Sequence, residues 1–433
     1  MHVVIIGGGF AGMASAARLA KLGHAVSLFD AAPALGGALS QVQLDDFIFD
    51  SGPSTTLLPA VTRDLFRKSG RPLEREYELV PVPVIAEHRF VDGTSLALTG
   101  GSRAGQKVAF EALGEGLGHE WVGYVDTWGE VWERLRKDYL ERPWDPTMAS
   151  PESKKILASR LSLTKRLRSA FTDDRLALVA GHRFTSEGHD LRRVPAWLGT
   201  LSYVEQKFGS WTSPQGLGGL GAVMASRLRT RKVEIHTSTP VLDVLVRGGR
   251  AVGVRTAAGE VAADAVVCAV DPRRLPALRP LVKRTRSTSL PHLTHLGLLD
   301  DGAADPPGEL VLHGASPLVL RHGGSAPEGR RVVTVQSRGM VPADVLDEMA
   351  ARGHDLRDRV IARLDRTPET LTREWGGSPL GVQWRGSGTV RRRLGPDTPV
   401  KGLYAAGAHA TPGSGLPFTG LSGALVAQAI GPA

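Results

Sequence analysis

Three glycines close to the amino terminus have the spacing of a phosphate-binding turn. Residues 7–12 read Gly-Gly-Gly-Phe-Ala-Gly and fit the pattern G-x-G-x-x-G, and an acidic residue, Asp30, follows about twenty residues later. In this pattern the first glycine permits a tight turn, the second lets the backbone approach a pyrophosphate, and the third lets a helix pack against a strand. The carboxylate of Asp30 can accept hydrogen bonds from both hydroxyls of a ribose. The predicted cofactor contacts in this segment are Gly7, Gly9, Phe10, Ala11, Gly12, Asp30 and Ala31.

Apolar segments on either side of these glycines predict the strand–turn–helix–strand unit that such a site requires. Residues 3–6 form a short apolar run that is typical of a strand buried on both faces. A helical pattern covers residues 13–22 and ends at Gly23, and a second buried strand covers residues 25–29. The amino terminus of the helix presents unpaired N–H groups and a positive dipole end to the phosphates. This setting favours a dinucleotide site over a glycine-rich turn without a ligand.

The composition excludes several other kinds of site. The chain has 433 residues, and its single cysteine, Cys268, rules out a disulfide framework and any zinc or iron–sulfur site built from several thiolates. We expect no metal site, and we expect Cys268 to be a packed core residue because it lies in the apolar run 265–270. The net charge of +9 raises the question of nucleic acid. The basic runs 227–232 and 391–393 carry no interleaved aromatic residues, so they predict no nucleic-acid binding.

Two segments that follow Asp30 carry a resemblance to a known family. Residues 33–38 hold a second glycine pair, and residues 49–54 read Phe-Asp-Ser-Gly-Pro-Ser. At these positions the chain resembles the FAD-binding oxidoreductases of the phytoene desaturase family, which are relatives of the amine oxidases. Ala38 stands where that family usually has an arginine, so a phosphate or flavin contact from this side chain is missing or supplied elsewhere. The resemblance implies FAD contacts at Gly36, Gly37, Ala38, Pro53 and Ser54.

The carboxyl-terminal part of the chain extends the resemblance. Residues 401–408 predict a strand that runs into a glycine turn, and residues 420–430 predict a closing helix. In the family this unit returns to the first domain and lays backbone N–H groups against the flavin, where glycines permit close approach to a flat ring. His409 is placed near the flavin by this pattern and is the candidate catalytic acid or base, although the family commonly has a small residue there. The resemblance implies further FAD contacts at Gly407, Ala408 and Leu416, and an adenine contact from the backbone of Val241.

The fold implied by the resemblance is α/β. A Rossmann-type FAD-binding domain of the glutathione-reductase/amine-oxidase kind carries an inserted α+β substrate domain. We expect the FAD-binding domain to comprise residues 1–75, 206–284 and 386–433, and the substrate domain to comprise residues 76–205 and 285–385. Strands are predicted at 233–236, 241–246, 251–256, 260–262 and 265–270. Gly216, Gly218 and Gly221 also fit G-x-G-x-x-G, but no strand is predicted before them, so we expect no second dinucleotide site.

Two helical patterns in the substrate domain leave alternatives open. Between residues 121 and 139, aromatic and apolar residues recur every three to four positions, as on one face of a helix. This stripe is either the core of the substrate domain or, in part, the wall of an apolar or aromatic substrate cavity. Residues 152–171 predict a basic amphipathic helix, which is either a solvated charged face or a weak contact with an anionic membrane surface.

The sequence also carries an expectation about location. It begins directly with a strand, and no apolar run reaches the ~18 residues of a spanning helix. We therefore expect a cytoplasmic protein that is at most peripheral to the inner face of a membrane.

The function implied by the resemblance is an FAD-dependent dehydrogenase or desaturase. Such an enzyme transfers hydride from an apolar, isoprenoid or secondary-metabolite substrate to flavin N5. An amine- or amino-acid-oxidase-like flavoenzyme is the second hypothesis, and a non-catalytic FAD-bound protein at a membrane surface is the third. The substrate, the direction of the reaction, the electron acceptor and the oligomeric state stay open.

Overall fold

The computed structural model describes residues 1–302, 308–339 and 344–433. One of its two larger sheets is a five-stranded parallel sheet. The strand order is β20-β13-β1-β2-β9. The strands are β1 (His2–Ile6), β2 (Ala25–Phe29), β9 (Glu234–His236), β13 (Ala265–Cys268) and β20 (Leu403–Ala405). Strand β13, from the middle of the chain, lies beside β1, and β20, from near the end, lies beside β13. Segments far apart in the sequence thus complete one sheet.

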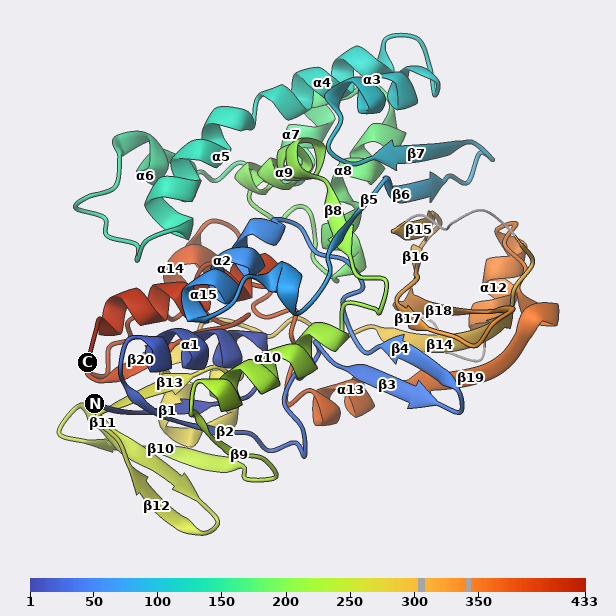
Figure 1. The fold of residues 1–433 in the computed structure, drawn as a ribbon. Helices are drawn as coiled ribbons and strands as arrows, with labels where there is room; N and C mark the ends of the chain where they lie inside the picture. Colours follow the sequence, from blue (N-terminus) through green and yellow to red (C-terminus); the bar gives the residue numbers. More distant parts are fainter. Residues whose placement is uncertain (303–307, 340–343) are drawn as a thin grey trace.

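Both faces of this sheet are covered, as the continuous apolar runs predict. Val3 and Ile5 belong to the core beneath the helices, whereas Val4 and Ile6 belong to the core on the opposite face. Helix α1 (Phe10–Lys21) packs against α2 (Pro59–Ser69), α10 (Gly219–Thr230) and α15 (Leu416–Ile430). The opposite face is covered by a three-stranded meander of β10 (Val241–Arg247), β11 (Arg250–Thr256) and β12 (Gly259–Ala262) (Figure 1).

A second, seven-stranded sheet has the order β19-β14-β18-β16-β15-β6-β7. Its strands are β6 (Val84–Arg89), β7 (Ser95–Thr99), β14 (His292–Leu299), β15 (Glu309–Leu312), β16 (Leu318–Arg321), β18 (Arg330–Ser337) and β19 (Val360–Arg366). All neighbours are antiparallel except β15 and β6, which run parallel. The early strands β6 and β7 therefore extend a sheet that is made mainly from the second half of the chain (Figure 1).

A group of helices packs near this sheet and makes the largest aromatic core. The helices are α3 (Arg103–Glu111), α4 (Leu117–Asp126), α5 (Gly129–Leu135), α6 (Pro151–Ala158), α7 (Leu163–Ala170), α8 (Asp174–Ser186) and α9 (Thr200–Phe208). The aromatic stripe at 121–139 lies on two helices and a π-helical turn (Arg136–Leu140) rather than on one helix. The break falls at Thr127 and Trp128. The stripe residues nevertheless share one buried core.

The prediction of one amphipathic helix over 152–171 is wrong. Helix α6 ends at Ala158 and α7 begins at Leu163, and each has its own serine cap. The Ser150 and Ser162 hydroxyls accept hydrogen bonds from backbone N–H groups of the first turns, which fixes two separate helix starts. The apolar side chains of both helices, including Leu157 and Leu163, are buried in the aromatic core.

Two other predictions differ from the structure: the start of the last helix and the absence of a strand before Gly216. Helix α15 begins at Leu416, four residues earlier than predicted, because Pro417 fits the first turn of a helix. Strand β8 (Ser210–Thr212) does precede Gly216, so the expectation of no strand there was wrong. It pairs antiparallel with β5 (Val80–Val82) and stands outside the parallel sheet.

The remaining α-helices and strands connect these parts of the fold. They are β3 (Gln41–Leu44), β4 (Phe47–Asp50), β17 (Gly324–Ser325), α11 (Arg279–Val282), α12 (Val345–Ala351), α13 (Pro368–Glu374) and α14 (Gly388–Arg392). Among the described helices, none has the length and apolar character needed to cross a membrane.

Candidate active site

A cavity of about 660 Å³ opens at the carboxyl ends of the parallel strands. Its lining includes Ile6 and Phe29, the last residues of β1 and β2, and it extends to side chains of α5 and α8. The carboxyl edge of a parallel α/β sheet is where such folds bind ligands, because helix amino termini and flexible loops meet there. The size and enclosure are those of a ligand or cofactor site.

Each of the three motif glycines has a different relation to the fold, which its backbone angle and the space around it decide. Gly7 has φ +100°, which favours glycine, and its N–H donates to the Phe29 carbonyl. A Cβ on Gly12 would lie 1.9 Å from the Gly7 carbonyl oxygen, so this position must be glycine for α1 to approach β1. A Cβ on Gly9 would meet nothing within 4 Å, and φ −67° at this residue suits any side chain. The protein itself therefore does not require glycine at position 9, and the open space there faces the cavity.

Asp30 fixes the glycine turn. Its Oδ2 accepts a hydrogen bond from the Gly8 N–H at 2.5 Å, and its Oδ1 accepts one from the Ala32 N–H at 2.7 Å. Each carboxylate oxygen has two lone pairs, so each can accept a second donor from a ligand. Asp30 and Ala31 both line the cavity.

The second glycine pair closes against the first turn. The Gly36 N–H donates to the Gly8 carbonyl at 2.9 Å, and Gly36 and Gly37 both have positive φ. A Cβ on Gly52 would lie 2.6 Å from the Ala38 carbonyl oxygen, so the segment around Pro53 crosses this turn at close range. Gly36, Gly37, Ala38, Pro53 and Ser54 all line the cavity.

The carboxyl-terminal segment of the chain supplies another part of the cavity wall. Gly407 has φ +95°, and its N–H donates to the Ser422 hydroxyl, which ties the turn to α15. The amino terminus of α15 lies at the cavity, where Gly415 and Leu416 are part of the wall. A fifteen-residue helix places a positive dipole end there, which favours electron-rich ligand atoms.

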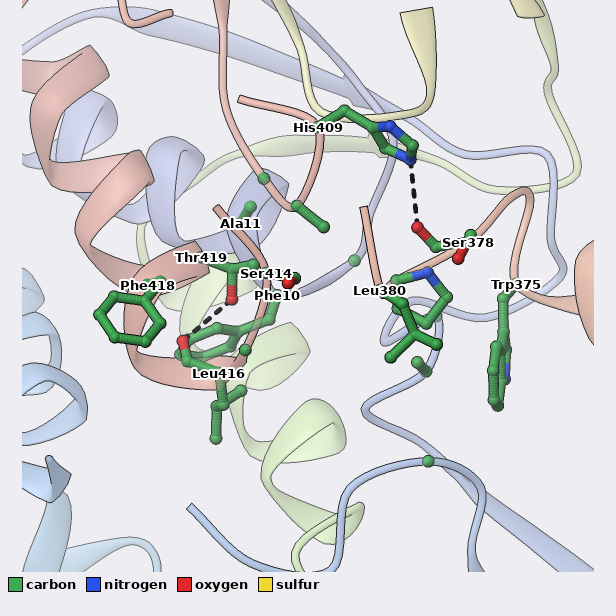
Figure 2. A pocket seen from close by; sticks show the side chains of 18 of the residues that line it. Phe10, Ala11, Trp375, Ser378, Leu380, His409, Ser414, Leu416, Phe418 and Thr419 are labelled. Atoms are coloured by element: carbon green, nitrogen blue, oxygen red, sulfur yellow. Dashed lines mark hydrogen bonds between the residues drawn. The ribbon is translucent and has the colours of Figure 1, made fainter. Parts of the chain in front are cut away.

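His409 lies above the loop that carries Trp375, Ser378 and Leu380 (Figure 2). Its Nε2 is 3.1 Å from the Ser378 carbonyl oxygen, which can only accept, so Nε2 carries the proton. Among the described residues Nδ1 has no hydrogen-bond partner and is buried. Burial lowers the pKa of His409, although Asp271 lies 3.8 Å from Nε2 and opposes that shift. The ring is therefore neutral near pH 7, with an acceptor lone pair at Nδ1.

The inner part of the cavity is aromatic. Trp132, Leu135 and Tyr139 from the stripe line it, whereas Trp121 and Tyr124 belong to the core only. The stripe therefore lies partly in the core and partly in the wall of this cavity. Phe184, Trp197 and Trp384 complete the aromatic wall.

Several buried polar atoms of this wall lack partners among the residues that the structure describes. They include the Tyr139 hydroxyl and the indole N–H groups of Trp132 and Trp197. The Arg393 guanidinium stacks 4.2 Å from the Trp384 ring and donates to the Pro412 carbonyl at 3.0 Å. Burial lowers the pKa of Arg393. Arg393 belongs to the predicted basic run 391–393, yet it packs inside the molecule.

A set of polar residues, four of them charged, also lines the cavity and was missed from the sequence. The set is Arg183, Glu187, Glu309, Arg321 and Gln336. These residues come from α8 and its end, β15, β16 and β18. No local spacing connects them, because the sheet register and the packing of α8 bring them together. No sequence pattern was available to find them.

The sequence profile of the family described as flavin containing amine oxidoreductase matches residues 10–431. The chain belongs to this family. It is an FAD-dependent oxidoreductase with an α/β fold of the Rossmann type.

Two carotenoid enzymes are among the similar sequences. A hydroxyneurosporene desaturase from Cereibacter sphaeroides is 27% identical, with 99% of this chain and 97% of the relative covered. A zeta-carotene-forming phytoene desaturase from Myxococcus xanthus is 26% identical, with 99% and 93% covered.

Solved structures share the fold. A putrescine oxidase variant superimposes with a TM-score of 0.71 at 18% identity, covering 99% of this chain and 98% of the other. A putative protoporphyrinogen oxidase from an Exiguobacterium species gives 0.66 at 17% identity, with the same coverage.

The residues of this flavin oxidoreductase fit its cofactor. The space beside Gly9 is a cradle that a Cβ would occupy, and it lies at the amino terminus of α1, as a pyrophosphate requires. Of the residues predicted to contact FAD, only Gly12 is outside the cavity wall. Those that line the wall are Gly7, Gly9, Phe10, Ala11, Asp30, Ala31, Gly36, Gly37, Ala38, Pro53, Ser54, Val241, Gly407, Ala408 and Leu416.

The single cysteine lies outside this site. Cys268 is 1% exposed, and burial raises the pKa of its thiol to about 12. It is a packed core residue at the end of β13, as predicted.

Proposed function

We propose that the protein dehydrogenates an apolar isoprenoid substrate. The observation that carries the proposal is one continuous cavity whose lining combines two kinds of surface. Part of its lining has the glycine turns and the helix amino termini that suit FAD, and another part is an aromatic wall that suits a hydrocarbon chain. The names of the similar sequences, which are carotenoid desaturases, support the same substrate class.

We propose the following division of labour for cofactor binding. Gly7, Gly9 and the amino terminus of α1 hold the pyrophosphate, Asp30 holds the ribose and Val241 contacts the adenine. Gly407, Ala408 and Leu416 lie along the flavin. The FAD-binding domain then consists of 1–75, 206–284 and 386–433, and the substrate domain consists of 76–205 and 285–385. When bound, FAD supplies the hydride acceptor for the reaction.

The chain contributes orientation and the exclusion of water. The buried rings of Tyr139, Trp197 and Trp384 form a rigid apolar wall that fixes the substrate and keeps the reacting C–H bond dry. His409 holds its proton at Nε2 against the Ser378 carbonyl. Its free lone pair at Nδ1 is the acceptor in this part of the wall.

The test is anaerobic mixing of the FAD-loaded enzyme with candidate substrates. Loss of the flavin absorbance band with a polyene such as phytoene or hydroxyneurosporene is the expected result. Loss of the band with amines alone would overturn the proposal in favour of an amine oxidase. If neither class changes the band and both bind, the non-catalytic hypothesis replaces it.

For residues 152–171, we propose contact with a membrane only through the charged outer face of helices α6 and α7. Most of the apolar face of these helices is buried against the aromatic core, and Leu161, in the link between them, is the large apolar side chain of the segment that stays exposed. Lys154, Lys155 and Lys165 remain on the exposed side. Any contact is then electrostatic and sensitive to salt.

A further inference from the structure

A buried arginine of the cavity wall has no acidic partner among the described residues. Arg393 directly follows α14, lines the cavity and is only 7% exposed. Its Nη1 donates to the Pro412 carbonyl at 3.0 Å and its Nη2 donates to the Val382 carbonyl at 3.4 Å, but these acceptors carry no net charge. Its Nε is buried and has no acceptor in the described parts of the chain. Such burial is unusual, because arginine is almost never fully buried unless it is paired.

The titratable neighbours of this guanidinium do not supply the missing negative charge. Burial lowers the pKa of Arg393, and among the described residues Tyr139 is the group that opposes this effect. Burial also raises the pKa of Tyr139, so its hydroxyl is neutral near pH 7. Burial, with Arg393 as a smaller cause, lowers the pKa of both His189 and His409, so these rings are neutral as well. One positive charge therefore remains unbalanced in this part of the wall.

The unpartnered polar atoms of the rings around Arg393 are hydrogen-bond donors. The Trp384 ring lies 4.2 Å from the guanidinium carbon, and the Trp197 ring meets Trp384 edge-on at 5.8 Å. The Tyr139 ring in turn lies 6.4 Å from the Trp197 ring. The Trp197 indole N–H and the Tyr139 hydroxyl are buried without partners among the described residues, and all four side chains belong to residues of the cavity wall. A ligand group that fills this place therefore needs acceptor atoms.

We propose that this part of the cavity binds a carboxylate on the substrate, with the Arg393 guanidinium as its counter-charge and the Tyr139 hydroxyl as a further donor. An ionised carboxylate brings the missing negative charge and has only acceptor atoms. This inference rests on the proposed isoprenoid substrate, whose chain lies against the aromatic wall. It narrows the substrate class to isoprenoid acids.

Other ligand groups suit these residues less well. An ammonium group would add a second positive charge beside Arg393, and a neutral hydrocarbon or hydroxyl would leave its charge unbalanced. A diphosphate would bring more negative charge than one arginine balances. The pyrophosphate of FAD is proposed to bind at Gly9, whereas Arg393 donates to Pro412 and stacks on Trp384 of the aromatic wall. The anion is therefore assigned to the substrate rather than to the cofactor.

The test compares four ligands that share one chain and differ at its end. Farnesoic acid, methyl farnesoate, farnesylamine and farnesyl diphosphate are titrated anaerobically into the FAD-loaded enzyme at pH 7, and calorimetry gives each Kd. A carboxylic acid is ionised at this pH and its methyl ester is uncharged, so this pair isolates the charge. We expect the acid to bind about tenfold or more tightly than the ester, which is the size of one hydrogen bond to a charged group. The amine and the diphosphate should bind more weakly than the acid.

Three variants locate the effect. Arg393→Met removes the charge and should reduce the acid-to-ester preference to about one, whereas Arg393→Lys keeps the charge and should keep part of the preference. Tyr139→Phe keeps the ring and removes the hydroxyl, so the preference should fall by about threefold. Retained binding of FAD and of the ester shows that a variant is folded. If Arg393→Met does not fold, because its bonds to two carbonyls are lost, the other two variants still decide.

The remaining outcomes overturn the inference. They are an ester that binds as tightly as the acid, tightest binding of the amine or the diphosphate, no binding of any of the four ligands, and a preference that persists in Arg393→Met. A weakened FAD affinity of Arg393→Met with an unchanged preference for the acid would assign the charge to the cofactor. Failure of the proposed oxidation appears separately, as a flavin that stays oxidised in an enzyme that still prefers the acid.

Discussion

Replacing Gly9 by alanine separates what the cofactor requires from what the fold requires. A Cβ at this position would meet no protein atom within 4 Å, and its φ of −67° is allowed for alanine. The protein without cofactor should therefore fold normally. A Gly→Ala change at a compatible backbone position stabilises a protein by ~0.4–1 kcal/mol, because the unfolded chain loses freedom. We expect the melting temperature of the FAD-free Gly9→Ala protein to be equal or higher.

The FAD affinity should move in the opposite direction. The methyl group would fill space that the pyrophosphate needs, and forcing an extra methyl into a packed site costs about 1–3 kcal/mol. At 1.4 kcal/mol for each factor of ten, this corresponds to an increase in Kd of about 5-fold to about 150-fold. The effect comes from the ligand alone, since the protein has no atom to clash with.

Fluorescence quenching of FAD on titration with FAD-free protein measures the affinity, and thermal unfolding of the same protein measures the stability. Gly12→Ala is the matched control. Its Cβ would lie 1.9 Å from the Gly7 carbonyl oxygen, so this variant should lose stability even without FAD. Unchanged FAD affinity in Gly9→Ala, or a lowered melting temperature of its FAD-free form, would refute the reasoning.

Three further predictions concern other parts of the molecule. Replacing His409 by alanine with FAD still bound should slow flavin reduction by a candidate substrate more than about tenfold in stopped-flow mixing, and an unchanged rate excludes it as an acid or base. Burial raises the pKa of Asp50 from 3.8 to about 6, so the folded protein holds that proton more tightly than the unfolded chain. The free energy of unfolding should therefore fall by about 2 kcal/mol between pH 4 and pH 7, and Asp50→Asn should flatten this slope in urea titrations; an unaltered slope contradicts it. The protein should sediment with anionic vesicles at low salt and be released at high salt, and Lys154→Glu/Lys155→Glu should weaken this binding; no binding at low salt excludes the membrane contact.

The part of the cavity wall made by the glycine turns was predictable because its determinants are local. The turn at 7–12, the strands on either side of it and Asp30 lie within thirty residues, and each has a backbone or packing reason that the residue type reveals. The glycine turn at Gly407 was predictable in the same way. The helix over 152–171 was mispredicted because its charge pattern is periodic, yet the caps at Ser150 and Ser162 divide it.

Other parts of the cavity wall depend on contacts that no local pattern encodes. Arg183 and Glu205 are 22 residues apart, and Arg321 meets Gln336 only because β16 and β18 are neighbours. Arg393 looks like part of a surface basic run, but its guanidinium is buried over Trp384.

The sequence by itself determined the parallel sheet and the place of the glycine turns, because backbone conformation and strand burial leave a direct trace in residue type, whereas FAD followed from the resemblance to a known family. Only the tertiary structure decided which part of the aromatic stripe faces the cavity and which charged residues meet there. Those outcomes depend on sheet register and on the packing of α8 against strands more than a hundred residues away, where the free energy comes from the whole assembled core.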